Sequence, residues 1–155
     1  MFMNDISPSW NKKYLLLAQH ISSWSKDPST KVGAVAVGGV GQILATGFNG
    51  FPRGIDDNKK RLTDREEKYK LVVHAEMNCI YNATHNGVSL KDSTLYVWGL
   101  PVCSECAKGV IQVGIKHIVM PSYLDLPEKW FNSFEQTKKV FDEASVTYEH
   151  IDCRY

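Results

Sequence analysis

The 155 residues include 18 lysines and arginines against 17 aspartates and glutamates, a formal net charge of +1, and 43% of the residues are hydrophobic. This length and composition are typical of one globular domain, so we expect residues 1–155 to fold as a single domain. A basic run interleaved with aromatic residues is missing from the sequence, which argues against a nucleic-acid polymer as partner.

The sequence carries no pattern typical of secretion or membrane insertion. Its first ten residues contain no apolar core, and no apolar run reaches the length of a membrane span. The four cysteines, at positions 79, 103, 106 and 153, are spaced too unevenly to suggest a disulfide scaffold. We therefore expect a cytoplasmic protein that contacts no membrane, in which a Cys-x-x-Cys pair serves metal or redox chemistry.

A helix is predicted at the start of the chain, with Ser7 as its cap and Pro8 at its first position. Apolar residues then recur at helical spacing, and we expect this stripe to face a sheet: Trp10, Tyr14, Leu17, Ala18, Ile21 and Trp24. The segment 26–29, which contains Pro28, ends the helix.

Two strands are predicted next, over 32–37 and 42–48, joined by a glycine-rich turn into an antiparallel hairpin. Asn49 lies where the second strand opens into a loop with several Gly and Pro residues, a usual location for a binding residue. The charged segment 56–70 is interpreted mainly as a solvated face, with a short helix starting at the capping box 63–66.

The remaining elements alternate between helix and strand. Strands are predicted over 94–98, 116–120 and 146–150, and helices over 74–84, 103–113 and 127–144, the last with Trp130, Phe131, Phe134, Val140 and Phe141 inward. Each crossover is long enough for a right-handed βαβ connection. The predicted fold class is therefore α/β: a five-stranded mixed sheet, its last two strands parallel, in a three-layer α/β/α arrangement.

The chemistry-bearing residues fall at the starts of two predicted helices, where ligands bind in open α/β sheets. His74 begins one helix, and Cys103 and Cys106 begin the next. One imidazole and two thiols suit a catalytic zinc whose fourth position stays open for water. Glu76, two residues after the histidine, is placed to move protons for that water, so the centre suits water addition to an electron-poor ring carbon and expulsion of ammonia. Taken alone, the two cysteines also suit a redox pair or half of a structural zinc site.

His-Ala-Glu at 74–76, followed by Pro101 and the Cys-x-x-Cys pair, matches the signature described for zinc-dependent nucleoside and nucleobase deaminases. Further stretches resemble the deoxycytidylate (dCMP) deaminases of the zinc-dependent cytidine/deoxycytidylate deaminase family: 27–34, 47–54, 73–76, 106–108 and 114–115. The stretch Gly-Phe-Asn-Gly-Phe-Pro-Arg-Gly at 47–54 narrows the resemblance to dCMP deaminases.

The resemblance implies a cytidine-deaminase-like fold and hydrolysis of dCMP to dUMP and ammonia, which supplies dUMP for dTMP synthesis. It implies that one catalytic zinc ion per chain is held by His74, Cys103 and Cys106, with Glu76 as the proton shuttle. The family usually has proline directly before the first cysteine, whereas here Val102 intervenes, so we expect an altered main chain beside the base. Some relatives hold a second, structural zinc before the catalytic histidine, but residues 51–73 contain neither His nor Cys.

Substrate and effector contacts follow from the same resemblance. The main chain at Ala75 would meet the pyrimidine, and Asn49 would bond the sugar. Lys31 and Thr30 are our candidates for the substrate phosphate. The resemblance also implies a homo-oligomer, with a hexamer favoured, that dCTP activates and dTTP inhibits, and effector-binding residues are sought at Arg53 and Asn58.

Two other functions stay open. One is deamination of a base within tRNA or single-stranded DNA, which the near-neutral charge disfavours. The other is a catalytically silent subunit that senses nucleotides, which the presence of Glu76 beside all three metal ligands disfavours.

Tyr123, after the fourth predicted strand, is a candidate to close over the substrate.

Overall fold

The computed structural model describes residues 7–122 and 127–153. Its centre is one five-stranded sheet of order β2-β1-β3-β4-β5. The strands are β1 (Gly33–Val37), β2 (Ile43–Phe48), β3 (Thr94–Trp98), β4 (His117–Pro121) and β5 (Thr147–Ile151). β1 runs antiparallel to both β2 and β3, whereas β3, β4 and β5 are parallel, so the predicted hairpin and parallel last strands are confirmed.

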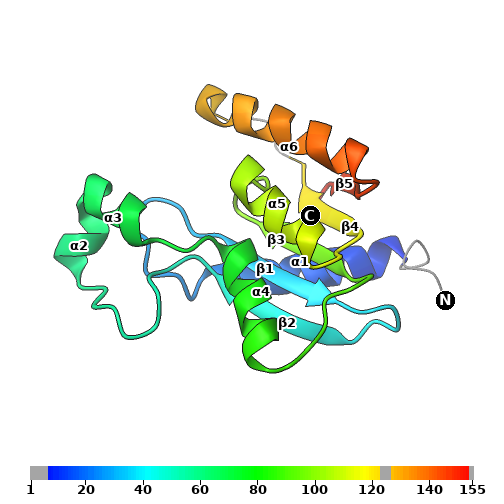
Figure 1. The fold of residues 1–155 in the computed structure, drawn as a ribbon, viewed down its shortest axis with the longest axis horizontal. Helices are drawn as coiled ribbons and strands as arrows, with labels where there is room; N and C mark the ends of the chain where they lie inside the picture. The colour runs from blue at the N-terminus through cyan, green and yellow to red at the C-terminus, as the bar shows by residue number, and fades with distance from the viewer. Residues whose placement is uncertain (1–6, 123–126, 154–155) are drawn as a thin grey trace.

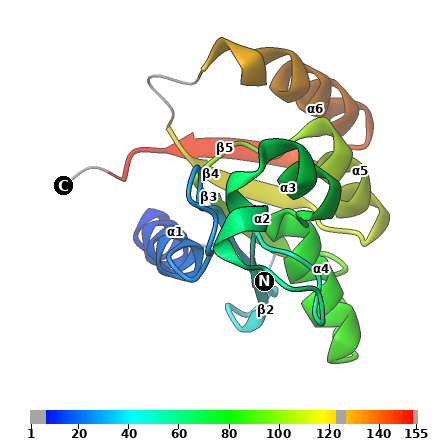
Figure 2. The ribbon, with the colours of Figure 1, turned by 90° about the vertical axis from the view of Figure 1, so that its left-hand side faces the viewer.

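Helices cover both faces of this sheet, as predicted (Figures 1 and 2). One face carries α1 (Pro8–Ser22), and the other carries α4 (Ala75–His85), α5 (Ser104–Gln112) and α6 (Phe131–Glu143). A 3-10 turn, η2 (Glu128–Trp130), precedes α6, and two short helices, α2 (Lys59–Thr63) and α3 (Arg65–Leu71), lie beyond one end of the sheet. Within the described ranges, no helix has both the length and the apolar character needed to cross a membrane.

The face that α1 turns to the sheet is narrower than the predicted stripe. It consists of Tyr14, Leu15, Ala18 and Ile21, which pack with β1, β3 and β4 residues. Trp10 and Trp24 are 49% and 53% exposed, so their predicted burial was wrong. Trp24 lies beyond the end of the helix at Ser22, and Trp10 lies in the first turn, where its ring packs against Tyr14 at 5.6 Å between centroids.

The last helix also differs from its prediction. Because residues 128–130 form a 3-10 turn, the α-helix begins only at Phe131 and its inward face follows Phe134, Thr137 and Phe141. Thr137 and Phe141 are fully buried, whereas Phe131 is 49% exposed and was wrongly predicted to point inward. The change of helical type before residue 131 shifts which side chains face the sheet.

The charged segment 56–70 is only partly a solvated face. It forms α2, capped by the Asn58 side chain, and α3, capped by Asp64, one residue after the predicted cap at Thr63. Leu62 and Lys68 are buried. The segment therefore packs against the rest of the molecule, which the sequence did not predict.

The strand register brings distant segments to one end of the sheet. Gly33, the first residue of β1, pairs with Phe48 at the end of β2 and with Trp98 at the end of β3. An isolated β-bridge between Gly50 and Val73 then places the segment that leads into α4 at the same end of the sheet. The segments 27–32, 49–50, 73–76 and 99–106 therefore meet there.

The contact between β2 and α4 is a backbone contact. A Cβ atom added at Gly47 would lie 2.3 Å from the Cys79 nitrogen and 2.6 Å from the Ala75 oxygen, so no larger residue fits without moving the helix. Because His74 and Ala75 begin this helix, the glycine fixes where they lie relative to the sheet.

We expect Gly47→Ala to lower the free energy of unfolding by about 2–3 kcal/mol, because the added methyl group must displace backbone rather than a flexible side chain. Gly39→Ala is the matched control, since nothing lies within 4 Å of its added Cβ atom, and it should change stability by less than about 0.5 kcal/mol. Urea unfolding followed by circular dichroism measures both, and equal midpoints for the two variants would contradict the close approach.

Candidate metal centre

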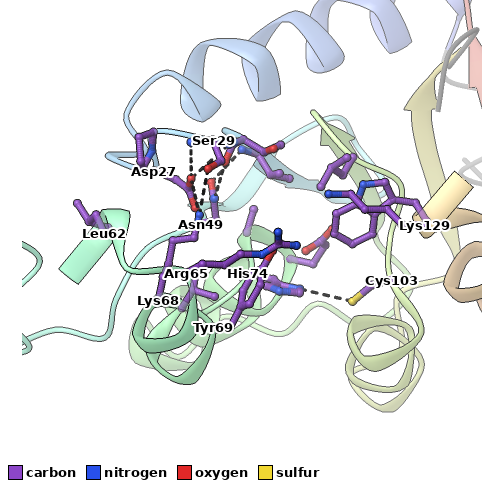
Figure 3. Close-up of a pocket in the computed structure, with 18 of the residues that line it drawn as sticks. Asp27, Ser29, Asn49, Leu62, Arg65, Lys68, Tyr69, His74, Cys103 and Lys129 are labelled. Atoms are coloured by element: carbon purple, nitrogen blue, oxygen red, sulfur yellow. Dashed lines mark hydrogen bonds and ion pairs between the residues drawn. The ribbon is translucent and has the colours of Figure 1, made fainter. Parts of the chain in front are cut away.

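Three ligand atoms meet between the starts of α4 and α5. His74 is the N-cap residue of α4, Cys103 is the N-cap residue of α5, and Cys106 follows in its first turn. His74 Nδ1 lies 3.4 Å from each of the two sulfur atoms (Figure 3 shows the contact with Cys103). Within residues 7–122 and 127–153, these are the residues whose ligand atoms gather closely enough for a metal, all within 4.8 Å of one another.

The donor set fits zinc. Thiolate and imidazole are the ligands that zinc binds at tetrahedral sites, and a set of three leaves one position open. The backbone N–H of Cys106 donates to Cys103 Sγ at 3.4 Å, so the loop already supports negative charge on that sulfur.

Protons are shared unequally among the three groups. A hydrogen bond from the Cys106 thiol lowers the pKa of the Cys103 thiol, and the same side-chain bond together with burial raises the pKa of Cys106. The hydrogen bond with Cys103 raises the pKa of His74. Because a metal ion binds only deprotonated ligands, binding would displace these protons and replace the hydrogen bonds.

Glu76 is the buried carboxylic acid of the site. Its side chain is 3% exposed and lines the same cavity as His74 and Cys103. Burial raises the pKa of Glu76 to about 7, and the negative charge of Cys103 adds to this shift. A carboxyl group with such a pKa can both take up and release a proton near neutral pH, which is what a general acid–base requires.

A cavity of about 440 Å³ lies over these residues, within the usual range for small-molecule sites. Of the residues predicted for the site, the structure brings these to its lining: His74, Cys103, Glu76, Ala75, Asn49 and Thr30. Cys106 is buried behind them.

The Asn49 side chain is held by the loop that faces it. Its Oδ1 accepts the Val32 N–H at 2.9 Å, and its Nδ2 donates to the Thr30 carbonyl at 2.9 Å. Each amide atom can form one further hydrogen bond. Asn49 therefore braces the 30–32 segment while keeping polar capacity toward the cavity.

The structure turns Lys31 away from the cavity. Thr30 and Val32 line the cavity, whereas Lys31, between them, does not. The Lys31 ammonium group donates to the Ser25 carbonyl instead.

A buried ion pair, not predicted from the sequence, borders the cavity. Lys68 Nζ lies 3.1 Å from Asp27 Oδ1, with the two side chains 8% and 9% exposed. The same Asp27 oxygen accepts the N–H groups of Ser29 and Thr30 at 2.8 and 3.2 Å. The Asp-Pro-Ser-Thr sequence suggests such a local turn, but the partner lies in the charged segment that was interpreted as solvated.

Four further lining residues were missed by sequence reasoning. They come from α3 and η2: Arg65, Tyr69, Lys129 and Trp130. No local pattern could have assigned them, because tertiary packing alone brings these two segments over the metal centre.

The residue inserted before the first cysteine points into the core. Val102 is fully buried, and its carbonyl accepts a hydrogen bond from Thr137 Oγ1 of α6 at 2.9 Å. Pro101 and Cys103, on either side, line the cavity. The extra residue therefore lies in the core, and its two neighbours form the cavity wall.

The structure does not bring the predicted effector residues into one cavity. Arg53 donates to Asn82 Oδ1 and lines a second cavity of about 370 Å³ with His85 and Asn86. Asn58 caps α2, and it does not line that second cavity. Tyr123 lies outside the described residues, so its predicted role has no structural account.

Comparison with known proteins gives one consistent family. The family model for the cytidine and deoxycytidylate deaminase zinc-binding region matches residues 8–122. An uncharacterized deaminase of Aliivibrio fischeri is 36% identical over 138 residues, covering 88% of this chain and 90% of its own. Human deoxycytidylate deaminase is 35% identical over 146 residues, covering 90% of this chain and 78% of its own. The crystal structure of dCMP deaminase from cyanophage S-TIM5 superposes with a TM-score of 0.74 at 26% identity, covering 94% of this chain and all of that one.

The raised pKa of Glu76 predicts a pH-dependent cost in the metal-free protein. Because the folded-state pKa, about 7, exceeds the ordinary 4.5, the folded state binds this proton more tightly than the unfolded state. The contribution of this proton to the free energy of unfolding is therefore fully present below pH 4.5 and is lost as the pH rises through about 7. The loss is about 3 kcal/mol at most. Glu76→Gln removes this titration.

Urea unfolding of chelator-treated wild type and Glu76→Gln between pH 4.5 and 8 measures the difference. We expect the variant to gain stability relative to the wild type as pH rises, because the other titrating groups are common to both proteins. A pH-independent difference would show that the carboxyl group is not held protonated by burial.

Proposed function

Because the chain belongs to the cytidine and deoxycytidylate deaminase family, we propose that it is a hydrolase that converts dCMP and water to dUMP and ammonia. The observation that carries this proposal is Glu76, a buried carboxyl group with a pKa of about 7, in the same cavity as the His74 and Cys103 ligands. The similarity to deoxycytidylate deaminases over 90% of the chain supports dCMP as the substrate.

The cofactor is zinc, and His74, Cys103 and Cys106 are the residues that would hold one ion per chain. When bound, zinc supplies the Lewis acidity that lets water act as a nucleophile near neutral pH. Glu76 takes a proton from the attacking water and delivers it to the amino group that leaves as ammonia. Its burial keeps bulk water from competing for that proton.

The substrate is oriented by residues that line the cavity. Ala75 lies in the first turn of α4, where N–H groups have no acceptor within the helix, so its main chain can donate to the pyrimidine. Asn49 uses its remaining hydrogen-bonding capacity on the sugar, and Thr30 lies beside it on the same wall.

Several broader properties are part of the proposal. The chain is a single deaminase domain over 1–155, and it works in the cytoplasm, where its four unpaired cysteines stay reduced.

It forms a homo-oligomer, with a hexamer favoured, and dCTP and dTTP regulate it. Exposed apolar side chains just after α1, on β2 and on α4 support subunit contacts: Trp24, Ile43, Phe48 and Tyr81. The cavity beside Arg53 is the proposed effector site.

The function is tested by incubating zinc-loaded protein with dCMP and separating the products. We expect dUMP and one equivalent of ammonia, with a much slower reaction on a cytosine in a single-stranded oligonucleotide. Absence of dUMP with and without dCTP would contradict the proposal, and preferential reaction of the oligonucleotide would assign the enzyme to polymer substrates.

The role of Glu76 is tested with Glu76→Gln. Removing the proton shuttle should lower kcat by about 100- to 10,000-fold. Zinc content, measured by atomic emission, should stay at one ion per chain because the three ligands are intact. An active variant, or one that loses zinc, would remove Glu76 from this role.

A further inference from the structure

The two halves of the metal centre are held by different parts of the fold. The histidine half is fixed by the sheet, because Gly47 of β2 lies against α4 and Asn78 of that helix donates to the Phe48 carbonyl at 2.7 Å. The other half, Cys103 and Cys106, lies at the start of α5, which packs against α6 (Figures 1 and 2). The cysteine half therefore borders a helix that contributes none of the three ligands.

Two hydroxyl groups of α6 bond the main chain on either side of Cys103. Thr137 Oγ1 donates to the Val102 carbonyl at 2.9 Å. Ser133 Oγ accepts the Ser104 N–H at 3.0 Å. Because Ser133 and Thr137 are separated by one helical turn, they lie on the same face of α6. We call these two hydroxyl groups the α6 clasp.

Both bonds of the α6 clasp satisfy backbone groups that need a partner. Val102 is fully buried, and a buried carbonyl without a hydrogen bond is costly. Ser104 is the first residue of α5, where N–H groups have no acceptor within the helix. Because Thr137 is itself fully buried, water cannot take over its hydrogen bond. The clasp is therefore part of the packed interior and not a chance approach of two surface side chains.

These two bonds set the backbone dihedral angles of Cys103. A peptide unit is planar, so the bond to the Val102 carbonyl orients the plane before Cys103, and the bond to the Ser104 N–H orients the plane after it. Cys103 lies between these planes with φ of −76° and ψ of 163°, and its sulfur is 3.4 Å from His74 Nδ1. The clasp uses no ligand atom, so it positions Cys103 without competing for the metal.

The position of Cys106 follows from that of Cys103. The Cys106 N–H donates to Cys103 Sγ at 3.4 Å, and the Ala107 N–H donates to the Cys103 carbonyl at 2.9 Å. The first turn of α5 thus starts from Cys103. A change in the backbone direction of this residue would therefore move both sulfur atoms relative to His74.

We propose that Thr137 and Ser133 are positioning residues for the metal ligands, so that α6 sets the zinc affinity of the site although it provides no ligand. This inference rests on the proposed function, which requires zinc, and goes beyond it. Groups that orient metal ligands from outside the coordination sphere change metal affinity or activity by about 10- to 100-fold when they are lost. The physical reason is that ligands already held in place need less ordering when the metal binds.

The zinc affinity of the folded protein, measured by competition with a chromogenic chelator at one fixed pH, tests the clasp without requiring turnover. Thr137→Val replaces a hydroxyl group by a methyl group of similar size, and we expect it to weaken zinc binding by about 10- to 100-fold. Thr137→Ser retains the hydroxyl group, so its zinc affinity should stay within about threefold of the wild type. Since Thr137→Ser also removes a buried methyl group, it separates loss of the bond from general disruption of the core.

Ser133→Ala is the second variant of the clasp. It removes the acceptor of the Ser104 N–H and should weaken zinc binding by about 10-fold. Alanine favours a helix, so α6 is expected to stay folded in this variant. If Thr137→Val does not fold, Ser133→Ala carries the test.

Thr94→Val is the matched control. Thr94 is 1% exposed, and its hydroxyl group has no hydrogen-bond partner among the residues that the structure describes. It begins β3, whereas the chain reaches the metal centre beyond the other end of that strand, at Trp98. The same exchange of hydroxyl for methyl at this position should leave the zinc affinity within about twofold of the wild type.

The clasp is overturned if folded Thr137→Val or Ser133→Ala retains wild-type zinc affinity, if Thr137→Ser binds zinc as weakly as Thr137→Val, or if Thr94→Val weakens binding equally. Its failure is separable from failure of the proposed function. Zinc binding that depends on the clasp in a protein that does not deaminate dCMP supports the clasp and rejects the reaction. Deamination of dCMP with unchanged zinc affinity in the clasp variants rejects the clasp alone.

Discussion

The register of β1 between its two antiparallel neighbours is the constraint on which the site depends. With Gly33 opposite both Phe48 and Trp98, the chain that enters β1 and the chains that leave β2 and β3 meet at one end of the sheet. A shift by one residue would reverse which side chains of β1 face α1 and which face α4. The close approach at Gly47 then fixes α4, and with it His74 and Glu76, against the same sheet end.

Charge within the cavity is distributed according to how deeply each group is buried. Asp27 and Lys68, both nearly inaccessible, neutralise each other and hold the wall together. Glu76 is equally buried, and this burial, together with the negative charge of Cys103, raises its pKa to about 7, so it can exchange a proton near neutrality. Arg65 and Lys129 place cationic side chains on the remaining walls. One cavity therefore combines a structural pair, a proton carrier and a surface suited to an anion.

Helix α6 holds the segment that carries the metal ligand Cys103 in place. Thr137 of α6 bonds the carbonyl of Val102, and Ser133 Oγ of the same helix accepts the N–H of Ser104 at 3.0 Å. These bonds secure the residues on both sides of Cys103. The cavity wall before the first cysteine is thus tied to α6, the helix that directly follows η2.

The sequence alone determined the α/β fold class, the bounds of the five strands to within one residue and the metal-binding cluster, because hydrophobic periodicity, caps and the Cys-x-x-Cys spacing are local properties. It also determined the role expected of Glu76, which follows from its spacing to His74. Only the tertiary structure decided that Lys31 points away, that Trp10, Trp24 and Phe131 are exposed, and that the charged segment contributes Arg65 and Lys68 to the cavity. These outcomes depend on which distant segment packs against each side chain, and such contacts leave no mark on the local sequence pattern.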